Sequence, residues 1–171
     1  MGDHATRRVA ALFGARRIRR TRSGHYDLRL PDPERELLGN LVSQLRQLVA
    51  DPAAAERDPS LRRLFPTAYP DDEEREAEYR AMVGDELRDS RLQALETVER
   101  SLAATRVEEE QLVAWMGAVN DVRLVLGTRL DVTEETTFDV DPQDPDAPLL
   151  AAYAYLGYLL EEMVEALSKG M

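Results

Sequence analysis

The sequence contains no cysteine, only two histidines (His4 and His25) and a single lysine, Lys169. Without cysteine the chain cannot form a disulfide, a thiolate metal site or a thiol redox switch. A nucleophilic serine or threonine needs a nearby base, and both histidines lie in the basic N-terminal region, so we expect no catalytic triad. Neither histidine belongs to a zinc-binding or di-iron motif. These absences predict that the protein holds no metal and no cofactor and is not an enzyme.

Long apolar segments are missing as well. The longest uncharged apolar run covers residues 149–160, whereas a membrane-spanning helix needs roughly 20 residues. The N-terminus lacks the apolar region of a signal peptide. The hydrophobic fraction of 43% and the charged fraction of 32% over 171 residues are those of a globular domain. We therefore expect a cytoplasmic protein without membrane contact.

Negative charge is in excess, but it is unevenly spread. The net charge is −11, yet residues 1–23 contain seven arginines and one acidic residue. The acidic remainder should repel phosphate backbones, which makes duplex nucleic acid a poor partner for the body of the protein. The basic N-terminal region is either a solvated end or a contact for an acidic partner. The basic patch consists of Arg16, Arg17, Arg19, Arg20 and Arg22.

The segment 16–30 has the pattern of a small β-hairpin. Tyr26, Leu28 and Leu30 alternate with charged residues, which is the period of a strand with one buried face. Gly24 can supply the positive φ of a tight turn. Two strands alone are marginally stable, so the hairpin should pack on helices. We predict a flexible basic extension over residues 1–15 and a single helical domain over residues 16–168.

Helical spacing of apolar residues dominates the rest of the chain. It predicts helices over residues 32–50, 72–104, 107–130 and 149–168, and a short turn over residues 60–64. The apolar stripe of the second helix changes phase near Gly84, where we expect either a kink or two helices that meet around Gly84 and Asp85. Thr105 and Glu108 have the spacing of a capping box before the third helix. The predicted fold class is all-α, a helical bundle of about five to six helices with a small N-terminal β-hairpin packed on it.

The last helix, residues 149–168, is apolar on every side over its first half. A heptad pattern predicts one buried seam, formed by Leu149, Tyr153, Leu156, Leu160, Met163 and Leu167. Such a helix is either the central helix of the bundle or one half of a homodimer contact. We favour the central helix and keep the homodimer as the alternative.

An acidic loop precedes that helix. Residues 131–147 contain seven acidic residues and no basic residue. Asp139, Asp141, Asp144 and Asp146 could offer oxygen ligands to calcium, but the loop lacks the glycine and glutamate positions of an EF-hand. We therefore favour a solvated loop over a calcium site.

One polar constellation lies on the third and second helices. It consists of Asn120, Asp121, Arg123 and Arg129, together with Arg88 and Asp89. Gly117, Asn120, Leu124 and Gly127 share one helical face, where small residues would allow another helix to approach closely. The constellation is interpreted first as a structural polar network that fixes helix register. The alternatives are a small-molecule or catalytic site and a partner-binding surface.

Three segments of the chain resemble a known family when they are taken together. They are residues 16–36, residues 61–70 (LRRLFPTAYP) and residues 115–130 (WMGAVNDVRLVLGTRL). The chain is similar over residues 13–168 to an actinobacterial family catalogued as a domain of unknown function, often encoded beside the Clp protease adaptor. The resemblance implies an all-α cytoplasmic protein, and some relatives are described as oxidative-stress transcriptional regulators that act with a sigma factor. A thiol switch proposed in that setting cannot be carried over, because this chain has no cysteine.

These observations favour a non-enzymatic cytoplasmic regulatory module that binds another protein, with a sigma factor or RNA polymerase as the candidate partner. One alternative is a DNA-binding regulator that contacts phosphates through the Arg-rich hairpin. Another is a small-ligand-binding protein that uses the region of Asp121 and Arg123.

Overall fold

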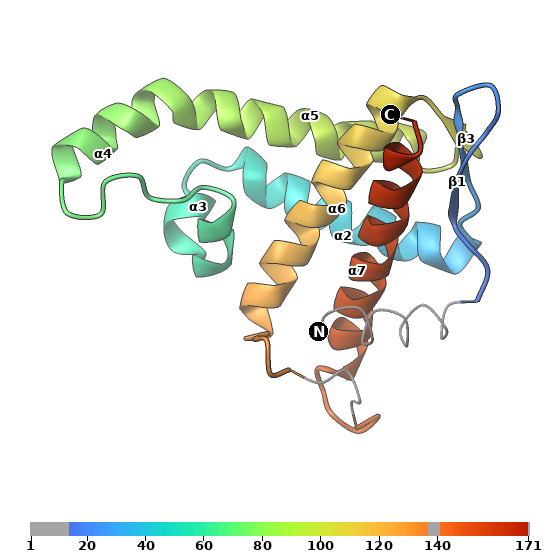
Figure 1. Cartoon of the computed structure of the whole chain (residues 1–171). Helices are drawn as coiled ribbons and strands as arrows, with labels where there is room; N and C mark the ends of the chain where they lie inside the picture. The colour runs from blue at the N-terminus through green and yellow to red at the C-terminus, as the bar shows by residue number, and fades with distance from the viewer. Residues whose placement is uncertain (1–13, 137–140, 171) are drawn as a thin grey trace.

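The computed structural model describes residues 14–136 and 141–170. It confirms the helical bundle with an N-terminal hairpin (Figure 1). The elements in chain order are β1 (Ile18–Arg20), β2 (Tyr26–Leu28), α2 (Asp32–Ala50), α3 (Ala54–Arg57), the 3-10 helix η1 (Pro59–Arg63), α4 (Glu73–Tyr79), the π-helix η2 (Arg80–Gly84), α5 (Asp85–Ser101), β3 (Arg106–Val107), α6 (Glu109–Arg129) and α7 (Ala147–Ser168). The predicted extension, residues 1–15, lies almost entirely outside the described residues.

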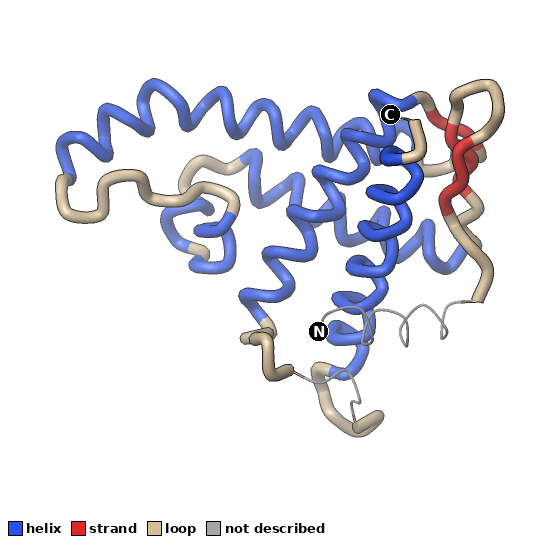
Figure 2. Tube along the Cα trace, in the orientation of Figure 1, coloured by secondary structure: helices blue, strands red, loops and turns tan. Residues whose placement is uncertain are grey.

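The helices form the core by packing α5 against α2 and α6, and α6 against α7. Trp115 of α6 is fully buried, and its Nε1 donates a hydrogen bond to Ser101 Oγ on α5 at 2.7 Å. Val42 and Leu95 come from α2 and α5 and are equally inaccessible to solvent. The strands lie together at one end of the molecule, beside the C-terminal end of α7 (Figure 2). This end of the molecule carries the basic hairpin.

The predicted hairpin is confirmed, with Gly24 in the turn at φ 88°. The structure adds a third strand, β3, which pairs antiparallel with β2 and places Val107 opposite Tyr26. The predicted capping box at Thr105 is wrong. The backbone N–H of Leu28 donates to the carbonyl of Thr105 at 2.8 Å, so this segment is extended and cannot begin a helix. Helix α6 begins after Glu108, which forms its own capping box with Gln111.

The phase change predicted near Gly84 takes the form of the π-helix η2, which joins α4 to α5. Its wider hydrogen-bonding pattern accommodates an extra residue in the chain without ending the helix. In Figure 1, α4 and the first part of α5 extend beyond the helices α6 and α7. Met82 of η2 is 76% exposed on this arm.

The heptad seam predicted for α7 is only partly right. Leu156 and Met163 are fully buried, but Leu149 is 42% exposed. The buried face is completed by residues outside the predicted seam: Ala152, Tyr155, Tyr158, Leu159, Glu162 and Ala166. Because α6 and β1 both pack on α7, the buried arc is wider than a two-helix seam and is rotated from it. The same chain therefore covers the core face of α7, but the prediction that α7 is the central helix is wrong. The central position belongs to α6, which packs on α5, α7, η1 and α2, whereas α7 packs on α6 and β1 and lies at the side of the bundle.

Among the helices of the described residues, none combines the length and the apolar character that crossing a bilayer requires.

Candidate interaction site on the basic hairpin

Strand β1 is attached to α7 through a buried carboxylate, Glu162, which is 6% exposed. The backbone N–H of Arg17 donates to Glu162 Oε2 at 2.8 Å, and the Tyr158 hydroxyl donates to Oε1 at 3.1 Å. Burial raises the pKa of Glu162 above its ordinary value, against the opposing effect of these bonds. Burial, and then the charge of Glu162, raise the pKa of Tyr158 to about 12. Glu162 thus accepts a backbone N–H at the edge of the sheet and fixes the hairpin on α7.

The side chain of Arg17 also turns inward. Its Nη2 lies 2.6 Å from Glu34 Oε1, and its Nε donates to Glu34 Oε2 at 3.0 Å. The Tyr155 hydroxyl donates to the same Oε2 at 2.6 Å. Burial works to raise the pKa of Glu34, but the bonds from Arg17 and Tyr155 outweigh it, and the pKa is lowered. Arg17 therefore belongs to a structural junction of β1, α2 and α7, and its charge is neutralised there.

Arg16 reaches the surface of α7. Its Nη2 lies 2.7 Å from Glu165 Oε2, and Lys169 Nζ lies 3.0 Å from Oε1 of the same carboxylate. The side chain of Arg16 is nevertheless 46% exposed. Two cations therefore share Glu165 and remain accessible from outside.

The outer face of the sheet carries most of the remaining positive charge. Because Arg19 pairs with Asp27, and Asp27 with Arg106, these three side chains project from the same face. Arg106 Nε lies 3.1 Å from Asp27 Oδ1, and Arg29 Nη2 lies 4.0 Å from Oδ2. Within the described part of the chain, no ion pair involves Arg19. One aspartate thus faces three arginines, and Arg22 adds an exposed cation in the turn.

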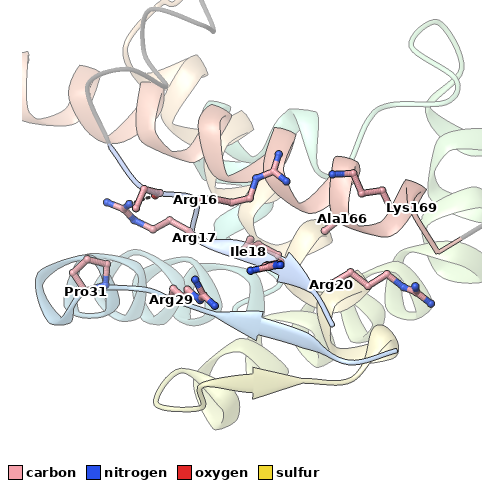
Figure 3. Close-up of a pocket in the computed structure, with 10 residues that line it drawn as sticks. Arg16, Arg17, Ile18, Arg20, Arg29, Pro31, Ala166 and Lys169 are labelled. Atoms are coloured by element: carbon pink, nitrogen blue, oxygen red, sulfur yellow. Dashed lines mark hydrogen bonds between the residues drawn. The ribbon is translucent and has the colours of Figure 1, made fainter. Parts of the chain in front are cut away.

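A groove of about 630 Å³ lies between β1 and the C-terminal end of α7 (Figure 3). It is lined by six cationic residues: Arg16, Arg17, Arg19, Arg20, Arg29 and Lys169. Figure 3 shows Arg16 running along α7, with Arg20 at the opposite end near Lys169. A β-carbon on Gly170 would lie 3.2 Å from Arg20 Nε, so the glycine leaves space for that arginine beside the end of α7. The structure therefore brings four of the five residues of the predicted basic patch together with Arg29 and Lys169.

The second predicted constellation is divided among several contacts. Asp121 is 4% exposed, and its Oδ1 lies 2.5 Å from Arg91 Nη1. Burial raises the pKa of Asp121, although the charge of Arg91 opposes the shift. Arg91 also donates from Nε to the carbonyl of Leu64 at 3.1 Å. This pair holds α5, α6 and the segment after η1 together.

The arginines of that constellation have other partners. Arg129 lies 2.9 Å from Asp58 Oδ2 and donates from Nε to Ser60 Oγ at 3.1 Å. Arg123 stacks over the Tyr153 ring of α7, with 4.7 Å between the guanidinium carbon and the ring centroid. Gly127 makes the close approach predicted for small residues on this face, because a β-carbon there would lie 3.0 Å from Tyr153 Cε2.

Arg88 pairs with Asp85 at 3.1 Å and lies over the Phe65 ring, as does Arg91. Asp89 is exposed and Asn120 is half-buried. Within the described residues, the six side chains therefore do not form one connected network.

Several contacts that hold the hairpin on the helices were not predicted from the sequence. Arg35 donates from Nε to the carbonyl of Leu30 at 2.9 Å and from Nη1 to that of Ala104 at 3.0 Å, which ties the hairpin to the end of α5. Glu34 and Arg35 lie within residues 16–36, the first segment that resembles the family. This resemblance was the one feature of the sequence that could have indicated their importance. Nothing in the local pattern distinguishes Arg91 or Glu162 from ordinary surface charges.

The acidic loop, for which the sequence favoured a solvated loop over a calcium site, shows no metal-binding geometry in its described part. Asp139 lies outside the described residues. Asp141 and Asp144 are exposed, and each accepts a hydrogen bond at 2.9 Å from the backbone N–H two residues ahead, as in an Asx turn. Over residues 14–136 and 141–170, no group of three acidic or histidine side chains is placed to hold a metal ion.

Comparisons with known proteins identify the family. The family model described as "Domain of unknown function (DUF2017)" matches residues 15–167. A relative from Mycobacterium leprae (strain TN), named "Putative oxidative stress regulator AosR", is 32% identical over 127 residues, which cover 64% of this chain. The match spans 58% of that relative's length. No solved structure matches the chain significantly. The chain belongs to the DUF2017 family of domains of unknown function.

Proposed function

We propose that the protein is a non-enzymatic cytoplasmic regulator that acts by binding a component of the transcription machinery, a sigma factor or RNA polymerase. The regulatory part of this proposal is supported by the relative named as a regulator. The observation that carries the mode of action is the basic groove, an accessible positive surface on a protein of net charge −11. Charge complementarity of this kind selects partners and accelerates their association.

The arrangement of the other polar residues supports a binding role over a catalytic one. Asp121 is paired with Arg91, and Arg129 with Asp58 and Ser60, so these side chains serve contacts between helices. A general base must instead be free to reach a substrate proton.

The test is reconstitution with purified actinobacterial RNA polymerase core and individual sigma factors, followed by size-exclusion chromatography. We expect a stoichiometric complex with one of these components. The charge-reversed variant R19E/R29E should weaken the complex, whereas R62E/R63E, which reverses two exposed arginines of η1, should not. A failure of every component to co-elute would contradict the proposal.

A second candidate function is DNA binding through the hairpin. It is favoured by the positions of Arg19, Arg29 and Arg106 on one exposed face of the sheet. If these three arginines contact phosphates, the logarithm of the binding constant should fall with the logarithm of salt concentration with a slope of about −2.7. Over the range of about 50–200 mM salt, proteins that contact roughly 6–10 phosphates lose about 10³–10⁵ in affinity. A binding constant that does not change over this range would exclude DNA binding through the hairpin.

A further inference from the structure

The basic groove has an excess of positive charge that its own carboxylates do not balance. Glu34 neutralises Arg17, and Glu165 is shared between Arg16 and Lys169. Arg16 Nε also lies 3.7 Å from Glu162 Oε1. Arg29 has only a 4.0 Å contact with Asp27, whose other oxygen faces Arg106. Within the described residues Arg19 and Arg20 have no carboxylate partner. The groove is therefore a local positive field on an acidic molecule, and a negatively charged group is the complementary ligand.

The shape of the groove restricts the size of that ligand. Its volume of about 630 Å³ lies within the roughly 300–1,000 Å³ of pockets that hold a small molecule or a few residues of a chain. The lining also includes four apolar residues, of which Ala15 and Pro31 are exposed and Ile18 and Ala166 are buried. A ligand that carries both carboxylates and small apolar groups matches this mixed lining.

We propose that the groove binds a short acidic peptide segment of the regulatory partner, with carboxylates held by Arg19 and Arg29 and apolar side chains placed between them. Guanidinium groups bind carboxylates through paired N–H donors, so Arg19 of β1 and Arg29, which directly follows β2, can fix two acidic residues of one segment. This inference rests on the proposed function and specifies the chemistry of the partner.

A peptide fits the observations better than duplex DNA does. A duplex presents phosphates along its whole length, so it would also approach the acidic surfaces of the molecule. Glu108, Glu109 and Glu110, which follow β3 directly, are all exposed and would repel it. A short segment can occupy the groove without meeting these carboxylates.

The experiment measures fluorescence anisotropy of the full chain with a labelled eight-residue peptide of alternating aspartate and leucine. The matched control peptide has asparagine in place of every aspartate. We expect the acidic peptide to bind, R19E/R29E to weaken its binding about tenfold, and the neutral variant R19Q/R29Q to weaken it by a smaller factor. The control variant R62E/R63E carries the same change in net charge and should bind as the wild type does. Thermal unfolding of each variant verifies that the fold is retained.

Several outcomes would overturn the inference. Equal weakening in R19E/R29E and R62E/R63E would mean that net charge, and not the groove, determines binding. Binding of the asparagine peptide, full competition by inorganic phosphate at the same charge concentration, or tighter binding of a duplex oligonucleotide would each exclude an acidic peptide as the preferred ligand. If the wild-type chain forms the complex with a transcription component, and R19E/R29E weakens that complex, but the acidic peptide does not bind, the inference fails while the proposed function stands.

Discussion

At the scale of single residues, Glu34 connects three parts of the chain that are far apart in sequence. It accepts hydrogen bonds from Arg17 of the segment leading into β1 and from Tyr155 of α7, while its own backbone belongs to the first turn of α2. A carboxylate that accepts charge-assisted hydrogen bonds is stabilised in its ionised form. The attachment of the hairpin to the helices therefore depends on the charge of this residue.

The first prediction concerns the variant E34Q and acid. Because the pKa of Glu34 is lowered by folding, its stabilising contribution is present above its unfolded pKa, near the ordinary value of 4.5. It is lost as the pH falls through the folded value. The free energy of unfolding of the wild type should exceed that of E34Q most at pH about 7, where the carboxylate is fully ionised. Urea titrations over a pH series measure this difference, and a gap that widens on acidification would contradict the assignment.

The second prediction compares two aspartates that the sequence analysis placed in the same constellation. D121A removes a buried partner of Arg91 and should destabilise the fold by about 2–4 kcal/mol. This is less than the loss of about 3–5 kcal/mol that follows when one partner of a fully buried ion pair is removed, because Arg91 is partly exposed. D89A alters an exposed side chain and should change stability by less than about 0.5 kcal/mol. Chemical denaturation of both variants tests this, and equal effects would contradict the structural role of Asp121.

The ion pair between Asp121 and Arg91 could not be predicted from the sequence. The position of Asp121 on α6 and its polar character are visible in the sequence, but its partner Arg91 lies 30 residues away. Several arginines of α5 have similar local surroundings, so the spacing of residues cannot choose among them. The packing of α5 on α6 makes the choice.

At the scale of secondary-structure elements, the sequence predicted segments with a clear apolar period. It did not predict a strand of two residues, or the buried face of a helix that is apolar on nearly all sides. Helix α2 and the hairpin follow directly from apolar periodicity. Strand β3 contains two residues, too few for any period, and only its pairing with β2 defines it. Helix α7 is apolar nearly all round at its start, so the pattern could not determine which arc is buried.

The third prediction tests the buried face of α7. Leu156 is fully buried, whereas Leu149, a member of the same predicted seam, is 42% exposed. L156A should destabilise the protein by about 2–5 kcal/mol, because it leaves a cavity in a packed core. L149A should cost less than about 1 kcal/mol. Thermal or urea unfolding measures the free energy of unfolding of both variants. Similar decreases in L156A and L149A would contradict the buried face described here and support the heptad seam predicted from the sequence.

At the scale of the whole molecule, the sequence revealed the charge polarity but not the groove. The surplus of arginine near the N-terminus follows directly from the number of each residue type in the sequence. The groove also needs Ala166 and Lys169, and only the fold brings the end of α7 beside β1. The same arrangement determines which surfaces remain free for association.

The last prediction concerns the oligomeric state. The core face of α7 is covered by α6 and β1 of the same chain, so the large buried side chains Tyr155, Leu156 and Met163 are not available to a second copy. The exposed apolar side chains on α7 are Leu149, Ala151 and Val164, and the two large ones, Leu149 and Val164, are separated by four turns of helix. Stable homodimers bury larger continuous surfaces. We therefore expect light scattering to give a mass near 19.3 kDa over the micromolar range. A mass of twice this value that the variant V164D returns to the monomer would instead establish the homodimer through α7.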